Sequence, residues 1–193
     1  MTAYDDVRTT RILWRSDELE SLERFAGGPS VGGWRFRGTA VLPIDGEPAQ
    51  ITYRIELDPL WRTRRAELAI EAERRAQHIV LGSDGEGTWT VEGVDAEPLD
   101  GCIDIDLGFS PATNTLQIRR LGLQTGESRT LPVAWLMFPE LTIQPLEQTY
   151  THLGPDRWQY ASEGFTAELA VDSGGYVLRY GDDLWRAVAH RTD

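Results

Sequence analysis

Lysine is absent from this chain of 193 residues, and all 19 basic residues are arginine. A lysine forms the Schiff base in many carbonyl-handling and pyridoxal-phosphate enzymes, and it contacts the phosphates in a P-loop. The absence of lysine therefore excludes these mechanisms. The glycine-rich segment "GSDGEGT" at 82–88 matches no phosphate-binding pattern either, and its place between two expected strands is typical of a hairpin turn.

Cysteine and histidine are also scarce, with one cysteine and three histidines in the chain. A single cysteine cannot form an internal disulfide, and the histidines do not have the close spacing of zinc ligands. We therefore expect neither a bound metal nor another cofactor. We interpret Cys102 as a small buried hydrophobic residue rather than as a reactive thiol.

Long apolar runs are missing as well. No segment approaches the roughly 20 apolar residues of a membrane-spanning helix, and the first residues lack the order of a secretory signal. The formal net charge is −12, so the surface as a whole repels nucleic acids and anionic lipid head groups. We expect a soluble, cytoplasmic protein that does not insert into membranes and does not bind nucleic acid; the sequence leaves its oligomeric state open.

Alternation of apolar and polar residues with a period of two dominates the chain. In "RAELAIEA" at 65–72, for example, Ala66, Leu68 and Ile70 share one face, while Glu67 and Glu71 share the other. This pattern predicts a mainly β fold with very little helix. We expect a large antiparallel curled sheet, either a half-barrel or a barrel-like sandwich, that forms a single domain over residues 1–193.

Two features of this prediction have alternative interpretations. The segment "SDELESLERFAGG" at 16–28 has a helix cap and a glycine stop but only a thin apolar stripe, so it is either a helix or a strand. Similar residues recur near 34–62 and 158–186. They indicate either an internal duplication of hairpin units or two hairpins that are alike by chance.

Charged pairs flank a turn in "CIDIDLGFSPATNTLQIRRL" at 102–121. On a strand, Asp104 and Asp106 share one face, where two carboxylates can hold a cation or act as an acid and a base. A structural role is the alternative, because Arg119 and Arg120 can clamp these carboxylates with paired hydrogen bonds.

Between the two charged pairs lies "SPATN". Ser110 and Pro111 suit the cap and the first position of one helical turn, and Asn114 suits a turn that bonds back to the backbone. A nucleophilic role for Ser110 is disfavoured, because the segment lacks the second glycine of a nucleophile elbow.

The chain has seven tryptophans, more than its six tyrosines or its five phenylalanines. In a large β domain, such rings fill the core or line a concave ligand site. Trp61 precedes Arg62 and Arg64, which share a strand face and can receive a carboxylate, a phosphate or a sugar; an exposed charge ladder is the alternative. Trp135 and Met137 lie in "VAWLMF" at 133–138, which is apolar on both faces and can line an apolar cavity.

Three segments resemble a bacterial family known as "putative glycolipid-binding" proteins: "LDPLWRTRRAEL" at 57–68, "LDGCIDIDLGFSPATNTLQIRRL" at 99–121, and the region from "QTYTHLG" to "DSGGYVLRY" at 148–180. The resemblance spans nearly the whole chain. It implies a β fold similar to the half-barrel carriers that move lipoproteins and lipids across the bacterial envelope, with an apolar concave face. It brings no catalytic residues with it.

The sequence thus favours a non-catalytic protein that binds a lipid or glycolipid in an apolar cavity. Trp61, Arg62, Arg64, Trp135 and Met137 are the candidate ligand-binding residues. The first alternative is a hydrolase or isomerase that uses the two aspartates of the 102–107 strand. The second alternative is a non-catalytic interaction protein.

Overall fold

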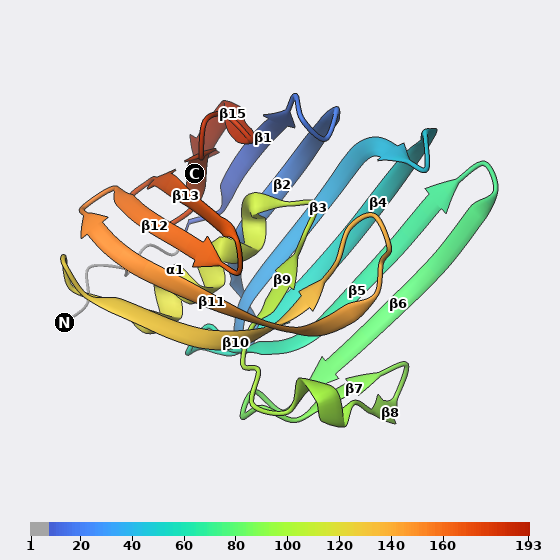
Figure 1. The fold of residues 1–193 in the computed structure, drawn as a ribbon, viewed down its shortest axis with the longest axis horizontal. Coiled ribbons are helices and arrows are strands. Elements are labelled where there is room, and N and C mark those ends of the chain that lie inside the picture. Colours follow the sequence, from blue (N-terminus) through green and yellow to red (C-terminus); the bar gives the residue numbers. More distant parts are fainter. Residues whose placement is uncertain (1–7) are drawn as a thin grey trace.

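The computed structural model describes residues 8–193, which form a 15-stranded sheet together with a few short helical segments (Figure 1). The strand order is β8-β7-β6-β5-β4-β3-β2-β1-β15-β14-β13-β12-β11-β10-β9, and the described strands pair antiparallel except for β9 with β10. The strands are β1 (Thr10–Ser16), β2 (Ser21–Ser30), β3 (Gly33–Ile44), β4 (Glu47–Leu57), β5 (Thr63–Ala72), β6 (Arg75–Ser83), β7 (Trp89–Val91), β8 (Val94–Asp95), β9 (Ile105–Leu107), β10 (Ser128–Leu136), β11 (Ile143–Gly154), β12 (Arg157–Ser162), β13 (Phe165–Val171), β14 (Val177–Tyr180) and β15 (Trp185–Thr192). The helical segments are η1 (Glu97–Leu99), η2 (Pro111–Thr113) and α1 (Asn114–Leu121).

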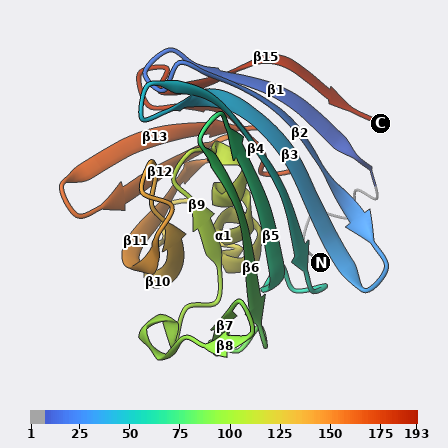
Figure 2. The ribbon, with the colours of Figure 1, turned by 90° about the vertical axis from the view of Figure 1, so that its right-hand side faces the viewer.

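The sheet curls but does not close into a barrel. Figure 2 shows β2–β6 on one side and β10–β13 on the other, with α1 and β9 between them. The two ends of the sheet, β8 and β9, are separate edges. The predicted mainly β fold with a large curled sheet and little helix is therefore confirmed.

The alternation of residues explains why the sheet has one buried face. In β4, Ile51, Tyr53, Ile55 and Leu57 are at most 4% exposed, whereas Arg54 between them points outward. Side chains two residues apart in a strand lie on the same face, so an alternating strand buries one set and exposes the other. The inner face of each long strand thus contributes a row of apolar residues to one core.

Aspartate followed by glycine makes the hairpin turn between β3 and β4. Asp45 and Gly46 both have positive φ, 53° and 78°. Two successive residues of this kind form the turn whose twist matches that of antiparallel strands, and aspartate and glycine adopt it at the least cost. The turn pairs Ile44 with Glu47 and sets the register of the long β3–β4 ladder.

The segment at 16–28 is not a helix. Residues 17–20 form a turn, and β2 begins at Ser21. Ser21, Glu23 and Phe25 all point inward, which places them on one strand face. The helical interpretation was wrong because pairing with β1 and β3 satisfies the backbone of this segment, while its apolar residues are too few for a helix face.

The segment 102–121 fills the concave side of the sheet. Its predicted strand is confirmed only over Ile105–Leu107, and an eight-residue helix, Asn114–Leu121, replaces the turn that we expected at Asn114. Ile105, Leu107, Phe109, Leu116 and Ile118 are at most 1% exposed. The space in which the sequence placed an apolar ligand cavity is therefore occupied by the chain itself.

In residues 8–193, no helix combines the length and the apolar character needed to cross a membrane. The organisation as a single domain and the duplication of hairpin units both stay predictions.

Candidate functional site

A small pocket lies at the rim of the curled sheet. Its volume is about 150 Å³. The start of β1, the start of β3, the last turn of α1, the β13–β14 loop and the end of β15 all contribute to it. The lining residues are Arg8, Thr10, Trp34, Arg119, Asp172, Ser173, Gly174, Tyr176, His190 and Thr192. The pocket therefore combines aromatic, cationic and anionic side chains from distant parts of the chain.

A turn after β4 places Trp61 beneath this pocket. The Asp58 Oδ1 atom accepts hydrogen bonds from the backbone N–H groups of Leu60 (2.8 Å) and Arg62 (3.0 Å). These bonds hold Trp61 at a φ of +67°, a region that residues other than glycine seldom adopt. Trp61 is only 6% exposed, because the turn directs its ring back into the sheet.

Trp61, Trp34 and Arg119 form a stack at the pocket wall. The two indole rings lie 4.3 Å apart between centroids. The Arg119 guanidinium carbon lies 4.4 Å from the Trp61 centroid and 5.4 Å from that of Trp34, which is cation–π geometry. Arg119 Nη1 also donates to the carbonyl of Gly174 at 2.9 Å. The guanidinium is thereby fixed in position at the pocket wall.

The loop after β13 forms the opposite wall. Asp172 Oδ1 accepts from the backbone N–H groups of Gly174 and Tyr176, both at 2.9 Å, and this repeats the pattern of Asp58. The other carboxylate oxygen of Asp172 lies 2.9 Å from Nε2 of His190. Asp172 thus orders its own loop and orients a partly exposed imidazole at the same time.

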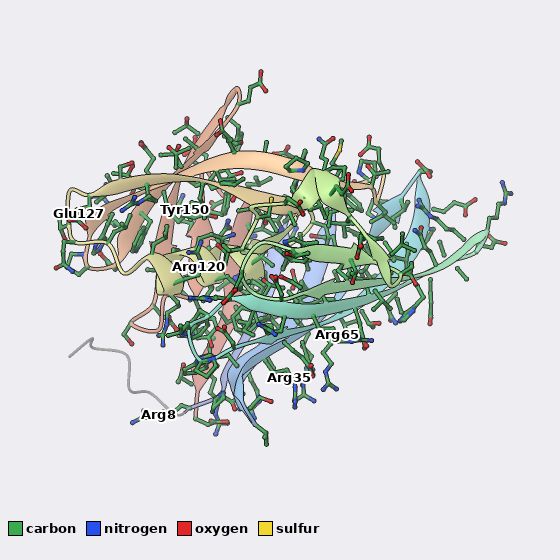
Figure 3. The ribbon with its side chains drawn as sticks, turned by 90° about the horizontal axis from the view of Figure 1, so that it is seen from below. Arg8, Arg35, Arg65, Arg120, Glu127 and Tyr150 are labelled. Carbon is green, nitrogen blue, oxygen red and sulfur yellow. The ribbon has the colours of Figure 1, made fainter. Side chains whose placement is uncertain are left out.

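The first charged pair of the 102–121 segment is a buried ion pair. Asp104 is 0% exposed, and Arg120 holds it through Nε and Nη2 at 2.6 to 3.1 Å. Burial raises the pKa of Asp104, and the hydrogen bonds and charge of Arg120 oppose that rise. In Figure 3, Arg120 lies between the two sides of the sheet. A carboxylate–arginine contact of this kind is the structural alternative that the sequence analysis gave for these residues.

Asp106 does not pair with an arginine. It accepts hydrogen bonds from Thr113 Oγ1 and Gln148 Nε2, both at 2.7 Å, and is 7% exposed. Burial raises its pKa, and these hydrogen bonds lower it. Asn114 Nδ2 donates to the Tyr150 hydroxyl instead of bonding back to the backbone. These hydrogen bonds of Asp106 and Asn114 are made inside the core, and they position α1 against β11.

Ser110 and Cys102 are buried too. Ser110 caps η2 as expected, since its Oγ accepts from the backbone N–H of Ala112 at 3.1 Å. Burial raises the pKa of the Cys102 thiol to about 11, and the charges of Asp104 and Asp100 add to that rise. The thiol form that this pKa favours is a poor nucleophile.

A buried carboxylate that sequence reasoning missed lies next to Ser110. Glu23 is 1% exposed, and its Oε1 accepts from the Tyr53 hydroxyl (2.5 Å) and from Ser110 Oγ (2.9 Å). Its Oε2 has no hydrogen-bond partner in the described part of the chain. Burial raises the pKa of Glu23 to about 7, against the effect of both hydrogen bonds. Reading 21–30 as a strand would have revealed Glu23 on the inner face.

The other predicted ligand-binding residues lie apart from the rim pocket. Arg62 and Arg64 reach the 83–88 turn, where they donate to the carbonyls of Gly85 and Asp84. Trp135 and Met137, on and just after β10, are partly buried at the far edge of the sheet. The structure brings only Trp61 of this predicted set to the pocket, together with Arg119 from the predicted clamp.

The sequence analysis missed Trp34, Asp172, Tyr176 and His190 as members of one site. They share no spacing pattern that marks a site, because they come from two separate strands, β3 and β15, and from the loop between β13 and β14. Within residues 8–193, no group of three or more His, Cys, Asp and Glu side chains is placed to hold a metal ion.

The fold and the pocket define a class of protein: an open, curled β-sheet whose concave side is filled and whose rim carries an aromatic and charged pocket. Residues 11–186 match the family described as "Putative glycolipid-binding", and the chain belongs to this family. It is also similar to the crystal structure of a "duf1089 family protein" from Pseudomonas aeruginosa, with 33% identity, a TM-score of 0.77, and coverage of 84% of this chain and 89% of that chain. Comparison with curated proteins gives no match.

The three segments that carry the family resemblance meet at the rim pocket. The first supplies Trp61, the second supplies Arg119, and the third supplies Asp172, Gly174 and Tyr176. The most distinctive parts of the sequence therefore converge on one place in the fold.

Proposed function

We propose that the protein is a non-catalytic binder of a glycolipid and that it holds the sugar headgroup in the rim pocket. The observation that carries this proposal is the joint lining of one pocket by Trp34, Arg119, Asp172 and His190. An aromatic ring offers a flat apolar surface to the C–H groups of a sugar, while guanidinium and carboxylate groups bond its hydroxyls. The family description supports a ligand of this class.

The apolar part of the ligand has a surface beside the pocket. Val31 and Leu60 are 102% and 60% exposed. They stand on neighbouring turns, since the backbone of Gly33 lies against Leu57 and Asp58. Val31 stands three residues before Trp34, and Leu60 directly precedes Trp61. Exposed apolar side chains this close in the chain to the pocket residues suit a ligand with a sugar at one end and an acyl chain at the other. This location replaces the internal cavity, because β9 and α1 fill the concave side.

The enzyme hypothesis has less support. Asp104 and Asp106 are both buried, and their carboxylate oxygens are engaged by Arg120, Thr113 and Gln148. A general acid or base must reach the proton of a substrate, and neither carboxylate faces one of the described pockets. The cytoplasmic location stays a prediction.

Binding of a glycosyl diacylglycerol in detergent-free nanodiscs tests the proposal, with phosphatidylcholine nanodiscs as the sugar-free control. We expect Trp34→Ala and Asp172→Asn to weaken binding by about tenfold each, the effect of losing one good contact of about 1.4 kcal/mol. Trp135→Ala is the matched control, since it removes a partly buried tryptophan on another part of the sheet.

The outcomes separate the two locations. Loss of binding in Trp34→Ala alone supports the rim pocket. If Trp135→Ala loses binding and Trp34→Ala does not, the ligand lies at the β10 edge and the rim pocket is the wrong site. No binding of the glycolipid by the unmodified protein would overturn the proposed function as a whole.

A further inference from the structure

A second hollow lies on the outer face of the sheet, on the side away from α1. It is a groove of about 620 Å³ over β1–β6. Arginines from four successive strands border it: Arg11, Arg24, Arg37 and Arg54. Figure 3 shows the neighbouring Arg35 and Arg65 on this same outer side, whereas Arg120 lies within the molecule.

Small side chains lie between these arginines. In the cross-strand register, Ala26 is paired with both Arg11 and Arg37, and Thr39 is paired with both Arg24 and Thr52. Neighbouring strands lie about 4.8 Å apart, so the side chains of β2, β3 and β4 stand within a span of about 10 Å. Short residues flanked by long cationic ones produce a hollow whose walls carry four arginines and one acidic residue, Glu67, which is opposite Arg54 in the β4–β5 ladder.

The arrangement of charge in the groove is unfavourable without a ligand. Arg37 is directly opposite Arg54 in the β3–β4 ladder, and like charges in opposed positions destabilise a sheet. Arg54 has Glu56 as an ion-pair partner, and Arg11 has Asp193. Arg24 and Arg37 are exposed and make no ion pair or hydrogen bond through their side chains with any residue of the described range 8–193.

We infer that this groove is a binding site for a small phosphate-bearing ligand. Guanidinium groups bind phosphate oxygens with paired, charge-assisted hydrogen bonds, and two unpaired arginines on adjacent strands offer four or more such donors. The net charge of −12 disfavours a long polyanion, so the ligand is a compact one. The groove lies on the outer face and the headgroup pocket on the inner side, so this inference stands independently of the proposed function.

Calorimetric titration with pyrophosphate and cosedimentation with phosphatidylcholine vesicles, with and without phosphatidylglycerol, test the inference. The test variant is Arg24→Gln with Arg37→Gln. The matched control is Arg157→Gln with Arg179→Gln, which removes the same charge from exposed positions on β12 and β14. We expect the test variant to weaken binding at least about tenfold, and the control to change it by less than about twofold.

The thermal transition shows whether the test variant still folds. We expect its Tm without ligand to equal or exceed that of the unmodified protein, because one of two opposed like charges is removed. Binding of pyrophosphate alone identifies a soluble ligand, and binding to phosphatidylglycerol vesicles alone identifies a lipid headgroup. If the unmodified protein binds neither, or if both double variants weaken binding equally, the inference is wrong.

Discussion

Glu23 is a buried group whose pKa burial raises to about 7. Its carboxyl lies on the inner face of β2, with Tyr53 and Ser110 bonded to one oxygen and no partner among residues 8–193 on the other. Desolvation disfavours the charged form, and this is why burial raises the pKa of Glu23 from 4.5 to about 7. The folded protein therefore binds a proton more tightly than the unfolded chain does.

This shift makes stability depend on pH with a definite sign. Between pH 4.5 and pH 7 the unfolded chain loses the proton of Glu23 while the folded protein keeps it, so the free energy of unfolding falls as pH rises. The full effect is about 3 kcal/mol. We compare the free energy of unfolding of Glu23→Gln with that of the unmodified protein by urea unfolding at pH 4 and at pH 8. We expect the difference to favour the variant by about 3 kcal/mol more at pH 8 than at pH 4.

A matched control variant shows what the loss of one negative charge does at an exposed position. Glu18→Gln alters an exposed glutamate on the 17–20 turn and should change the free energy of unfolding by a similar amount at both pH values. A difference between Glu23→Gln and the unmodified protein that does not vary with pH would show that Glu23 does not titrate in this range.

The Asp104–Arg120 pair is a second feature at the scale of single residues. Its bidentate geometry was foreseeable from the residue types, because two aspartates stand at one end of the 102–121 segment and two arginines at the other. The partners of Asp106 were not foreseeable. Gln148 lies 42 residues further along the chain, and only the pairing of β11 with β10 brings it there.

At the scale of elements, one turn design occurs three times. Asp58, Asp84 and Asp172 each accept hydrogen bonds from the backbone N–H groups two and four residues ahead. Short aspartate side chains bond to nearby backbone in this manner and stabilise turns. The Asp172 turn lines the rim pocket, the Asp58 turn holds Trp61 against Trp34 and Arg119, and the third turn lies between β6 and β7.

We expect Asp58→Ala to impair the pocket through its supporting turn. Loss of two hydrogen bonds, about 1 kcal/mol net, should lower Tm by about 3 °C in a chain of this size. Trp61 would no longer be held at its positive φ, so the stack with Trp34 and Arg119 would loosen and glycolipid binding would weaken. Differential scanning calorimetry and the nanodisc titration measure the two effects.

Asp84→Ala is the control, because it removes the same hydrogen-bond pattern from a turn outside the pocket. It should lower Tm without a change in glycolipid affinity. Equal losses of affinity in both variants would mean that overall stability, and not the position of Trp61, governs binding.

Secondary structure was predictable where one face is buried. The alternation in β3–β6 follows directly from apolar and polar residues in turn, and the hairpin at 83–88 was recognised from its glycines. The helix α1 was not predicted. Asn114, Thr115 and Gln117 are polar yet at most 3% exposed, so no amphipathic pattern marks this helix. Its surroundings within the curled sheet bury residues 114–118 on all sides.

At the scale of the whole molecule, the backbone amides of the open sheet are protected from hydrogen exchange to different degrees along its length. Central strands such as β3 and β4 have a partner on each side, whereas β8 has two residues and one neighbour. Local opening requires less free energy where fewer backbone bonds and buried contacts must break. We expect native-state hydrogen exchange, followed by mass spectrometry, to be fastest in β7–β8 and slowest in β2–β5. Equal protection of β7–β8 and β3–β4 would contradict an open sheet with a free β8 edge.

The amino-acid sequence by itself determined the class of fold, the absence of lysine chemistry and the resemblance to one family, because these depend on residue types and on short-range periodicity. The tertiary structure decided which residues form the rim pocket. Trp34, Trp61, Arg119, Asp172 and His190 are separated by up to 156 positions in the chain, and they meet because the curled sheet brings the ends of β1, β3 and β15 against α1. The same curl allowed the chain to fill its own concave side, so that apolar burial stabilises the fold and the polar pocket lies at the rim.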